Sequence, residues 1–325
     1  MSSILSRISL LLALLAAHSA AAHPCPVPLT GAPPQVKFVT SDIELFWRAI
    51  DMATPETMAD VLAREYLKKG SPGLADFTRM RIGDAKQLAA TVKAYPAYYA
   101  ALRESSRKVD AYRDTMLASF YCLESLYPRA VMPEVYFVIG RMNSAGTVDA
   151  RSLLIGVDMF GNSGTEAMAA LGSWHKAVVA PVERLPNIVA HELIHAQQSN
   201  GGAETLLAAA LNEGVADFIG ELICGQTINP HLHAFAKDRH VEMWRAFEPA
   251  MRGKDLGRWL YQGDQATADW PADLGYVMGY RIAAAYYAAM PDKARAIRDM
   301  LRIADAEAFL RASGYAAQME KAGSR

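Results

Sequence analysis

The sequence predicts an α+β fold that is predominantly helical, with a small antiparallel sheet next to the helix of residues 186–199. Three observations predict it. Apolar residues recur at helical spacing through most of 35–130 and again from Pro186 onward. Two short runs of β-branched and aromatic residues, at 135–139 and 153–157, interrupt this pattern. Hydrophobic residues make up 52% of the chain, which is enough for a sizeable core.

Residues 1–22 predict an export signal that precedes the fold. Arg7 is the only charged residue, an apolar run covers Ile8–Ala17, and the segment ends in three alanines. This pattern predicts cleavage after Ala22, and the apolar run is too short to cross a bilayer comfortably. No later apolar stretch is long enough for a span. We therefore expect an exported protein, periplasmic or secreted, with no stable membrane span after cleavage.

The charge balance argues against a nucleic-acid-binding protein, and the number of cysteines limits the disulfide bonds. Lys and Arg number 33 against 34 Asp and Glu, a net charge of −1. This leaves no basic excess to neutralise phosphates, so we expect no nucleic-acid partner. Cys25, Cys122 and Cys224 allow at most one internal pair, which the sequence does not identify. The apolar helical surroundings of Cys122 and Cys224 favour buried, unpaired thiols.

The signal is followed by a helical N-terminal region, 23–130, that opens with a Pro-rich lead-in. Thr54-Pro55-Glu56 predicts a helix start, because a capping hydroxyl precedes a proline in the first turn and an early acid. Pro96 opens a second helical stretch that continues at apolar spacing to about Tyr127. These helices carry no recognisable motif.

The remaining region, 131–325, begins with strands and returns to helix. Val135–Ile139 and Leu153–Val157 are strand-like, and the polar stretch 141–151 between them contains Gly146. This arrangement predicts two antiparallel strands joined by a long hairpin loop. Helical patterns then cover about 186–199, 203–224, 235–250, 273–289 and 292–303.

The first of these helices contains His191-Glu192-Leu193-Ile194-His195. A helix turns about 100° per residue, so side chains four residues apart lie on one face. Two imidazoles at this spacing can share one metal ion. Glu192 lies beside the first of them and can reach a water molecule at the metal. The pattern is typical of zinc hydrolases.

A third metal ligand is predicted on the next helix. Eighteen residues after His195 the chain reads Asn212-Glu213-Gly214-Val215-Ala216-Asp217. Glu213 can complete a His₂Glu set, which leaves the fourth position of a catalytic zinc ion open. Asp217 lies one turn further along and can accept the free ring N–H of His191, which fixes its tautomer. The set suits Zn²⁺, although other divalent ions also fit it.

The pattern H-E-x-x-H followed by N-E-x-x-x-D resembles the gluzincins, the thermolysin-like zinc metallopeptidases. The wider sequence is similar to a family of uncharacterised predicted Zn-dependent proteases related to gliding-motility lipoproteins. The resemblance covers Val135–Gly161, His191–Gln198, Glu213–Glu221 and Leu274–Ile282. It implies a zincin-like catalytic region in which His191, His195 and Glu213 bind zinc and Glu192 is the general base.

The resemblance also implies a downstream tyrosine or histidine that stabilises the oxyanion. Tyr276 is the first candidate and Tyr280 the second, since they lie four apart on one helix face with Gly279 allowing a close approach. Both tyrosines can equally be amphipathic core residues. The remaining candidates are His233, His240 and Arg281.

We therefore expect an exported zinc metallopeptidase that acts on a peptide or an unfolded protein. In gluzincins an edge strand beside the zinc helix pairs with the substrate, and the resemblance gives this role to Leu153–Val157. Two alternatives remain. One is a zinc amidase acting on cell-wall peptides; the other is a non-catalytic periplasmic binding or assembly protein with a vestigial metal site. Glu192 favours catalysis, because a structural zinc site is normally closed by four protein ligands.

Overall fold

The computed structural model describes residues 25–149, 151–161, 164–199, 204–261, 267 and 269–324. The export signal predicted at 1–22 lies outside these residues. These residues form helices and a single four-stranded sheet, which confirms the predicted α+β class. In the described part of the chain, no helix has both the length and the apolar character needed to cross a bilayer.

Short helices make up most of the chain before residue 127. In order these elements are β1 (Phe38–Val39), α1 (Ser41–Met52), α2 (Met58–Val61), a π-helix (Leu62–Leu67), α3 (Pro72–Phe77), a second π-helix (Thr78–Ile82), α4 (Ala85–Ala94), α5 (Pro96–Ser106), a 3₁₀ turn (Val109–Tyr112) and α6 (Arg113–Leu126). Pro96 opens α5 as predicted. The helix predicted at Thr54 begins only at Met58, because Thr54 instead forms a turn in which its N–H donates to Thr57 Oγ1 at 2.9 Å.

The sheet corrects the predicted strand pairing. Its strands are β1, β2 (Glu134–Val138), β3 (Gly146–Asp149) and β4 (Ser152–Gly156), in the spatial order β1-β2-β4-β3. The two predicted strands, β2 and β4, pair in parallel, so the predicted antiparallel hairpin between them is wrong. The polar stretch between them forms a third strand, and only the short β3–β4 connection makes an antiparallel pair. β4 is therefore internal, and the two edge strands are β1 and β3.

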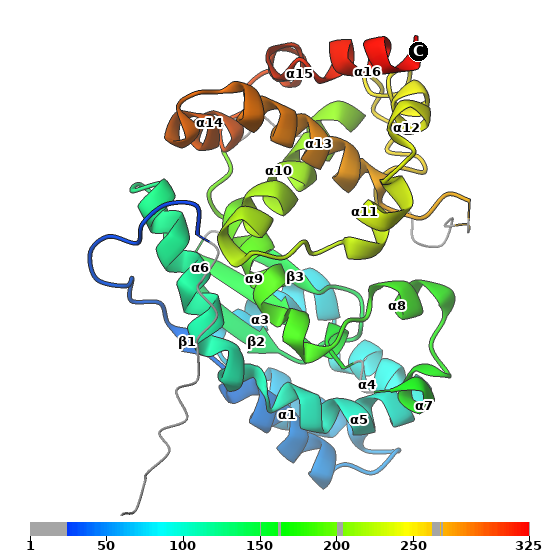
Figure 1. The fold of residues 1–325 in the computed structure, drawn as a ribbon. Helices are drawn as coiled ribbons and strands as arrows, with labels where there is room; N and C mark the ends of the chain where they lie inside the picture. The colour runs from blue at the N-terminus through cyan, green and yellow to red at the C-terminus, as the bar shows by residue number, and fades with distance from the viewer. Residues whose placement is uncertain are drawn as a thin grey trace, which may run out of the picture.

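Helices return after the sheet. They are α7 (Thr165–Met168), α8 (Ser173–Val178), a 3₁₀ turn (Val182–Arg184), α9 (Leu185–His195), α10 (Leu206–Cys224), α11 (Pro230–Ala236), α12 (His240–Phe247), α13 (Leu274–Ala289), α14 (Lys293–Met300), α15 (Ala306–Ser313) and α16 (Tyr315–Gly323). The single helix predicted over 235–250 is thus two, α11 and α12. Figure 1 shows α9 at the centre, with α1, α4 and α5 on one side and α10 and α13 on the other.

One hydrophobic core runs through the described chain. Its buried residues come from every part, from Phe38 in β1 to Tyr315 in α16. β1 adds to the sheet beside β2, so the N-terminal segment shares a sheet with strands that follow it by almost a hundred residues. α9 packs on β3 and β4 and also against α10. The core therefore holds α9, which carries the His-Glu-x-x-His sequence, between the sheet and α10.

The cysteines differ from the sequence expectation. Cys25 and Cys122 form a disulfide, so the predicted unpaired thiol at Cys122 is wrong. Cys122 is buried as expected, but the Pro-rich lead-in brings Cys25 against α6. Cys224 is free and partly buried at the end of α10.

Candidate metal centre

Helix α9 carries the His-Glu-x-x-His sequence into the interior. Pro186 lies in its first turn, where the missing N–H has no helical partner to lose. Asn187 ties this end to the chain after α10, donating from Nδ2 to the carbonyl oxygens of Gln226 at 3.1 Å and Thr227 at 3.2 Å. His191 and Glu192 are only 5% and 6% exposed. Buried polar groups of this kind require partners, because water is excluded from them.

Helix α10 supplies those partners. Thr205 caps its start, since its hydroxyl accepts the N–H of Ala208 at 3.2 Å. Gly225 ends it in the left-handed conformation, with φ of 81°. Glu213 and Asp217 lie one turn apart in this helix, and both are buried where it packs on α9.

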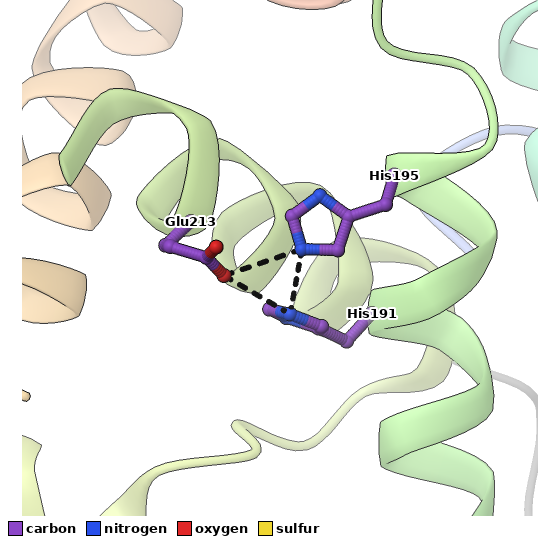
Figure 2. A group of neighbouring side chains, drawn as sticks. All are labelled: His191, His195 and Glu213. Atoms are coloured by element: carbon purple, nitrogen blue, oxygen red, sulfur yellow. Dashed lines mark hydrogen bonds and ion pairs between the residues drawn. The ribbon is translucent and has the colours of Figure 1, made fainter. Parts of the chain in front are cut away.

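The three predicted ligands converge on one point, as Figure 2 shows. His195 Nε2 lies 2.9 Å from His191 Nε2 and 3.2 Å from Glu213 Oε2. His191 Nε2 lies 3.5 Å from Glu213 Oε2. All three ligand atoms fall within 4.8 Å of one another, so the structure confirms that these side chains can hold one metal ion.

The outer nitrogen of each imidazole faces a polar side chain that can orient the ring. His191 Nδ1 lies 2.8 Å from Asp217 Oδ1, and His195 Nδ1 lies 2.6 Å from Gln198 Oε1. With its proton on Nδ1, each ring would turn the lone pair of Nε2 toward Glu213. Two lone pairs and a carboxylate oxygen repel one another unless a cation lies between them.

The spacing of the donors fits a zinc ion. Ligands bound tetrahedrally at zinc distances lie about 3.3–3.5 Å apart. The observed separations of 2.9, 3.2 and 3.5 Å lie at or a few tenths of an ångström below this range. Two nitrogens and one carboxylate oxygen also match the donor set of a catalytic rather than a structural zinc site.

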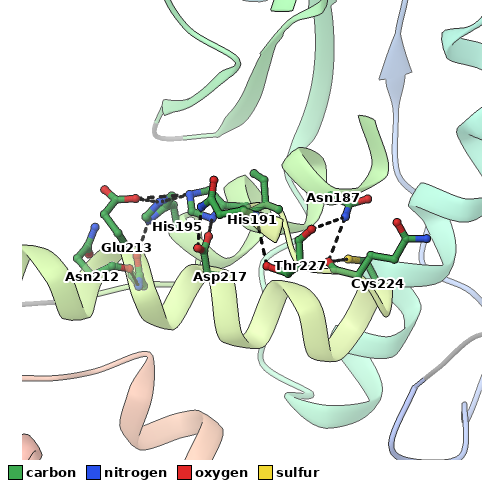
Figure 3. A network of polar contacts seen from close by, with 12 residues as sticks. Asn187, His191, His195, Asn212, Glu213, Asp217, Cys224 and Thr227 are labelled. Atoms are coloured by element: carbon green, nitrogen blue, oxygen red, sulfur yellow. Dashed lines mark hydrogen bonds and ion pairs between the residues drawn. The ribbon is translucent and has the colours of Figure 1, made fainter. Parts of the chain in front are cut away.

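A further layer of contacts fixes these partners, as Figure 3 shows in part. Asp217 Oδ2 accepts from Asn229 Nδ2 at 2.9 Å. Gln198 Nε2 donates to the carbonyl oxygen of Asn212 at 2.8 Å, which links the end of α9 to the residue before Glu213. Sequence reasoning missed Gln198, although its place three residues after His195, within the helix predicted over 186–199, was a usable signal.

Replacement of Asp217 by alanine is expected to weaken metal retention by about 10- to 100-fold, as for other losses of a group that orients a ligand. The change leaves His191 Nδ1 without its acceptor and frees the ring to rotate. Competition against a chromogenic chelator measures the affinity. Glu221→Ala, one turn further along α10 and outside the ligand cluster, is the matched control. Equal affinity in the Asp217 variant and the wild type would mean that this carboxylate does not support the site.

Glu192 lies where α9 meets the edge strand. A Cβ added at Gly146 of β3 would lie 2.5 Å from Glu192 Oε1, so only glycine leaves room for this carboxyl group. Burial raises the pKa of Glu192, and the facing imidazoles of His195 and His191 lower it by less. Burial also opposes ionisation of Glu213, but the same two rings outweigh it and hold its pKa well below the ordinary value. The pKa values of these two neighbouring carboxyl groups are therefore shifted in opposite directions.

The two candidate tyrosines occupy different places. The ring of Tyr276 stacks on His191, with centroids 6.1 Å apart and an interplanar angle of 26°. Tyr280 instead meets Phe218 and His233 edge-on and lines a separate hollow beside Glu221. Four residues advance a helix by about 6 Å, which carries Tyr280 past the ligand cluster.

Two of the other candidates point elsewhere. Arg281 donates to the carbonyl oxygen of Ala236 at 2.7 Å. His240 contacts the carbonyl oxygen of Lys237. Neither lines the hollow around the ligand cluster.

Tyr261 belongs to the site and was missed by sequence reasoning. Its hydroxyl donates to Glu213 Oε1 at 2.5 Å, the oxygen that does not face the histidines. Its φ is 59°, an uncommon value for a non-glycine residue, and its N–H donates to Asp273 Oδ1 at 2.7 Å. Burial raises the pKa of this phenol, and so does Glu213. No motif surrounds Tyr261, so nothing in the sequence identified it.

Two adjoining hollows meet at the ligand cluster. One, of about 460 Å³, contains the three ligands and is walled by Arg81, Thr147 and Tyr261. The other, of about 510 Å³, is mainly apolar and extends away from the cluster. Its apolar walls include Met159, Phe160, Trp174, Ile188 and Leu232. The two hollows share Gly146, His191, Glu192 and Tyr276, so the site opens in two directions from one centre.

Comparison with known proteins agrees with this geometry. A family model described as Predicted Zn-dependent protease (DUF2268) matches residues 174–311. The match includes the whole of α9, α10 and α13, and with them all three candidate ligands. It begins after the sheet. Searches among curated proteins and among solved structures return no match.

Proposed function

We propose that this protein is a zinc-dependent metallopeptidase that hydrolyses peptide bonds, with His191, His195 and Glu213 holding the metal. The observation that carries the proposal is the convergence of these three donors beside the buried carboxyl group of Glu192. The match to predicted Zn-dependent proteases over 174–311 supports it. A gluzincin-type site is the specific form that we propose, because the third ligand is a glutamate on the following helix.

Each side chain of the site has its own role in the proposed hydrolysis. A bound zinc ion supplies a Lewis acid that polarises the scissile carbonyl and lowers the pKa of a water molecule. Glu192 takes a proton from the attacking water and delivers it to the leaving amine. Its raised pKa suits it to hold that proton between the two transfers. Tyr276 lines both hollows and is our candidate donor to the oxyanion, whereas Tyr261 holds the free oxygen of Glu213.

The substrate would lie along β3 rather than along β4, which is internal. The N–H of Gly156 donates to the carbonyl oxygen of Ala145 at 3.0 Å, so Ala145 and Gly156 are a hydrogen-bonded pair. Because such pairs alternate along an antiparallel ladder, Thr147 also turns its main chain to β4. Gly146 and Val148 then turn theirs to the open edge. An extended peptide can add there as a further strand.

Antiparallel addition gives this substrate a direction. Its amino-terminal residues would lie beside Thr147 and Asp149, and its carboxyl-terminal residues would pass Gly146 into the apolar hollow. Phe160 and Trp174 in that hollow favour a bulky apolar side chain on the leaving-group side.

Export is also a proposal, with cleavage after Ala22. The disulfide between Cys25 and Cys122 supports it, because such bonds persist in oxidising compartments. The proposed partner is a peptide or an unfolded protein, with no nucleic acid.

Metal analysis combined with digestion tests the proposed function. The chain from His23 onward is expected to hold about one zinc ion and to cleave reduced, alkylated proteins. Chelation should abolish cleavage, and added zinc should restore it. Purified peptidoglycan is the parallel substrate. Release of peptides from peptidoglycan alone would favour the amidase alternative, and a zinc-loaded protein that hydrolyses neither substrate would support the non-catalytic alternative.

A further inference from the structure

Arg81 brings a positive charge from the N-terminal helices to the candidate site. It lies on the π-helix Thr78–Ile82 and lines the hollow that holds His191, Glu192 and His195. Its Nη2 donates to Thr147 Oγ1 at 2.9 Å. Its Nε is buried without a hydrogen-bond partner. Among the residues that the structure describes, no carboxylate lies within ion-pair distance of this guanidinium.

A neighbouring arginine on the same turn behaves differently. Arg79 points to solvent, with 66% of its side chain exposed, and pairs with Asp76 at 2.9 Å. Arg81 is half-buried and has only the neutral hydroxyl of Thr147. A charge that is partly withdrawn from water and has no carboxylate within ion-pair distance costs free energy. An anion entering the hollow would offset that cost.

The register of β3 shows which part of a bound peptide meets Arg81. Side chains of directly opposed residues in an antiparallel pair lie on the same face, about 4.5–5.5 Å apart. A substrate residue opposite Thr147 therefore places its side chain beside the guanidinium. Gly146 abuts Glu192, so the next substrate residue lies closer to the base. Since the strands run in opposite directions, the residue at Arg81 precedes the scissile bond.

We propose that Arg81 selects an acidic side chain, Asp or Glu, on the amino-terminal side of the scissile bond. The proposal rests on the proposed peptidase function and names its substrate class. A guanidinium binds a carboxylate through two parallel N–H donors, so its charge and geometry both favour this partner. The free carboxyl terminus of a short peptide is not the target, because that end leads into the apolar hollow.

Arg81 also lies close enough to Glu192 to influence it. Burial raises the pKa of Glu192, and the charge of Arg81 is among the weaker effects that lower it. A role exercised only through Glu192 would change the hydrolysis of every peptide by the same factor. A role in selection would change only the peptides that carry an acid. This difference separates the two roles.

The test uses peptides that are identical except for Asp, Asn or Lys at each position before the scissile bond. The zinc-loaded wild type is expected to prefer Asp over Asn by about 10- to 100-fold in kcat/KM at one position, the worth of a charge-assisted hydrogen bond. Arg81→Met should lose this preference, and its kcat/KM should fall much further for the Asp peptide than for the Asn peptide. Arg81→Lys should keep part of it. Arg79→Met is the matched control and should keep all of it.

Binding of the same peptides to the Glu192→Gln variant, measured by calorimetry, gives a second readout that needs no turnover. The Asp peptide should bind more tightly than the Asn peptide, and Arg81→Met in that background should remove the difference. Equal cleavage of Asp and Asn peptides at every position overturns the inference. So does a uniform loss across all peptides with a shifted pH profile. If the zinc-loaded wild type cleaves no peptide or protein at all, the proposed function fails, and the binding comparison alone decides the role of Arg81.

Discussion

Glu192→Gln is expected to lower kcat/KM for peptide hydrolysis by about 10²- to 10⁴-fold, the range for loss of a general base. Glutamine has nearly the same shape and keeps the carbonyl oxygen, but it cannot take a proton from water. The variant should still bind about one zinc ion, since the donors of His191, His195 and Glu213 are unchanged. Single-turnover hydrolysis of a peptide, with metal content measured on the same sample, gives both quantities.

The matched control for this variant is Glu221→Gln, an isosteric change on α10 outside the ligand cluster. It should retain wild-type activity and metal content. Residual hydrolysis by the Glu192 variant at the wild-type rate would remove Glu192 from the mechanism. Loss of zinc together with activity would point instead to a role in holding the site together.

Gly279→Ala is expected to destabilise the folded protein by about 3 kcal/mol, the upper part of the usual range for an overpacked core. A Cβ at Gly279 would lie 1.7 Å from the carbonyl oxygen of Ala210, and one at Gly214 would lie 2.1 Å from the carbonyl carbon of Gly279. These atoms belong to the backbones of α10 and α13, so the clash cannot be relieved by a side-chain rotation. The helices must move apart.

The sign of this effect is opposite to that of intrinsic helix propensity. Alanine is favoured over glycine in a helix interior by about 0.5–1 kcal/mol. Chemical denaturation measures the free energy of unfolding, and metal titration should show weaker binding, because α10 carries Glu213. Gly172→Ala is the control, since nothing lies within 4 Å of its added Cβ and its φ is −65°. Unchanged stability of the Gly279 variant would contradict the close approach of the two helices.

The strand register shows where prediction from sequence fails. Val135–Ile139 and Leu153–Val157 have the composition of strands, and both form strands. Their pairing direction depends on β3, a four-residue strand in a polar stretch that resembles a loop. β-Propensity reflects the packing of side chains more than an intrinsic preference of the backbone, so a short polar strand leaves little signal. The identity of the edge strand, and hence of the proposed substrate path, followed only from the assembled sheet.

The cysteines and the tyrosines illustrate the same limit. Spacing along one helix predicted that Tyr276 and Tyr280 share a face, but only Tyr276 stacks on a candidate ligand, His191, whereas Tyr280 meets His233. Cys25 and Cys122 are separated by 97 residues, and no local pattern marks one as the partner of the other.

By itself the sequence predicted the fold class and the three side chains that meet as candidate metal ligands. His191 and His195 are one turn apart in one helix, so helical geometry brings their rings together. Glu213 follows on the next helix, and the packing of α10 on α9 brings its carboxylate to the two rings. Tertiary structure decided which other side chains surround them: Arg81, Thr147, Gln198 and Tyr261. Arg81 and Tyr261 reach the site from segments far from α9 in the chain, and Thr147 reaches it from an edge strand that the pattern did not show. Such contacts arise from how helices and strands pack, and packing at long range leaves no periodicity in a single sequence.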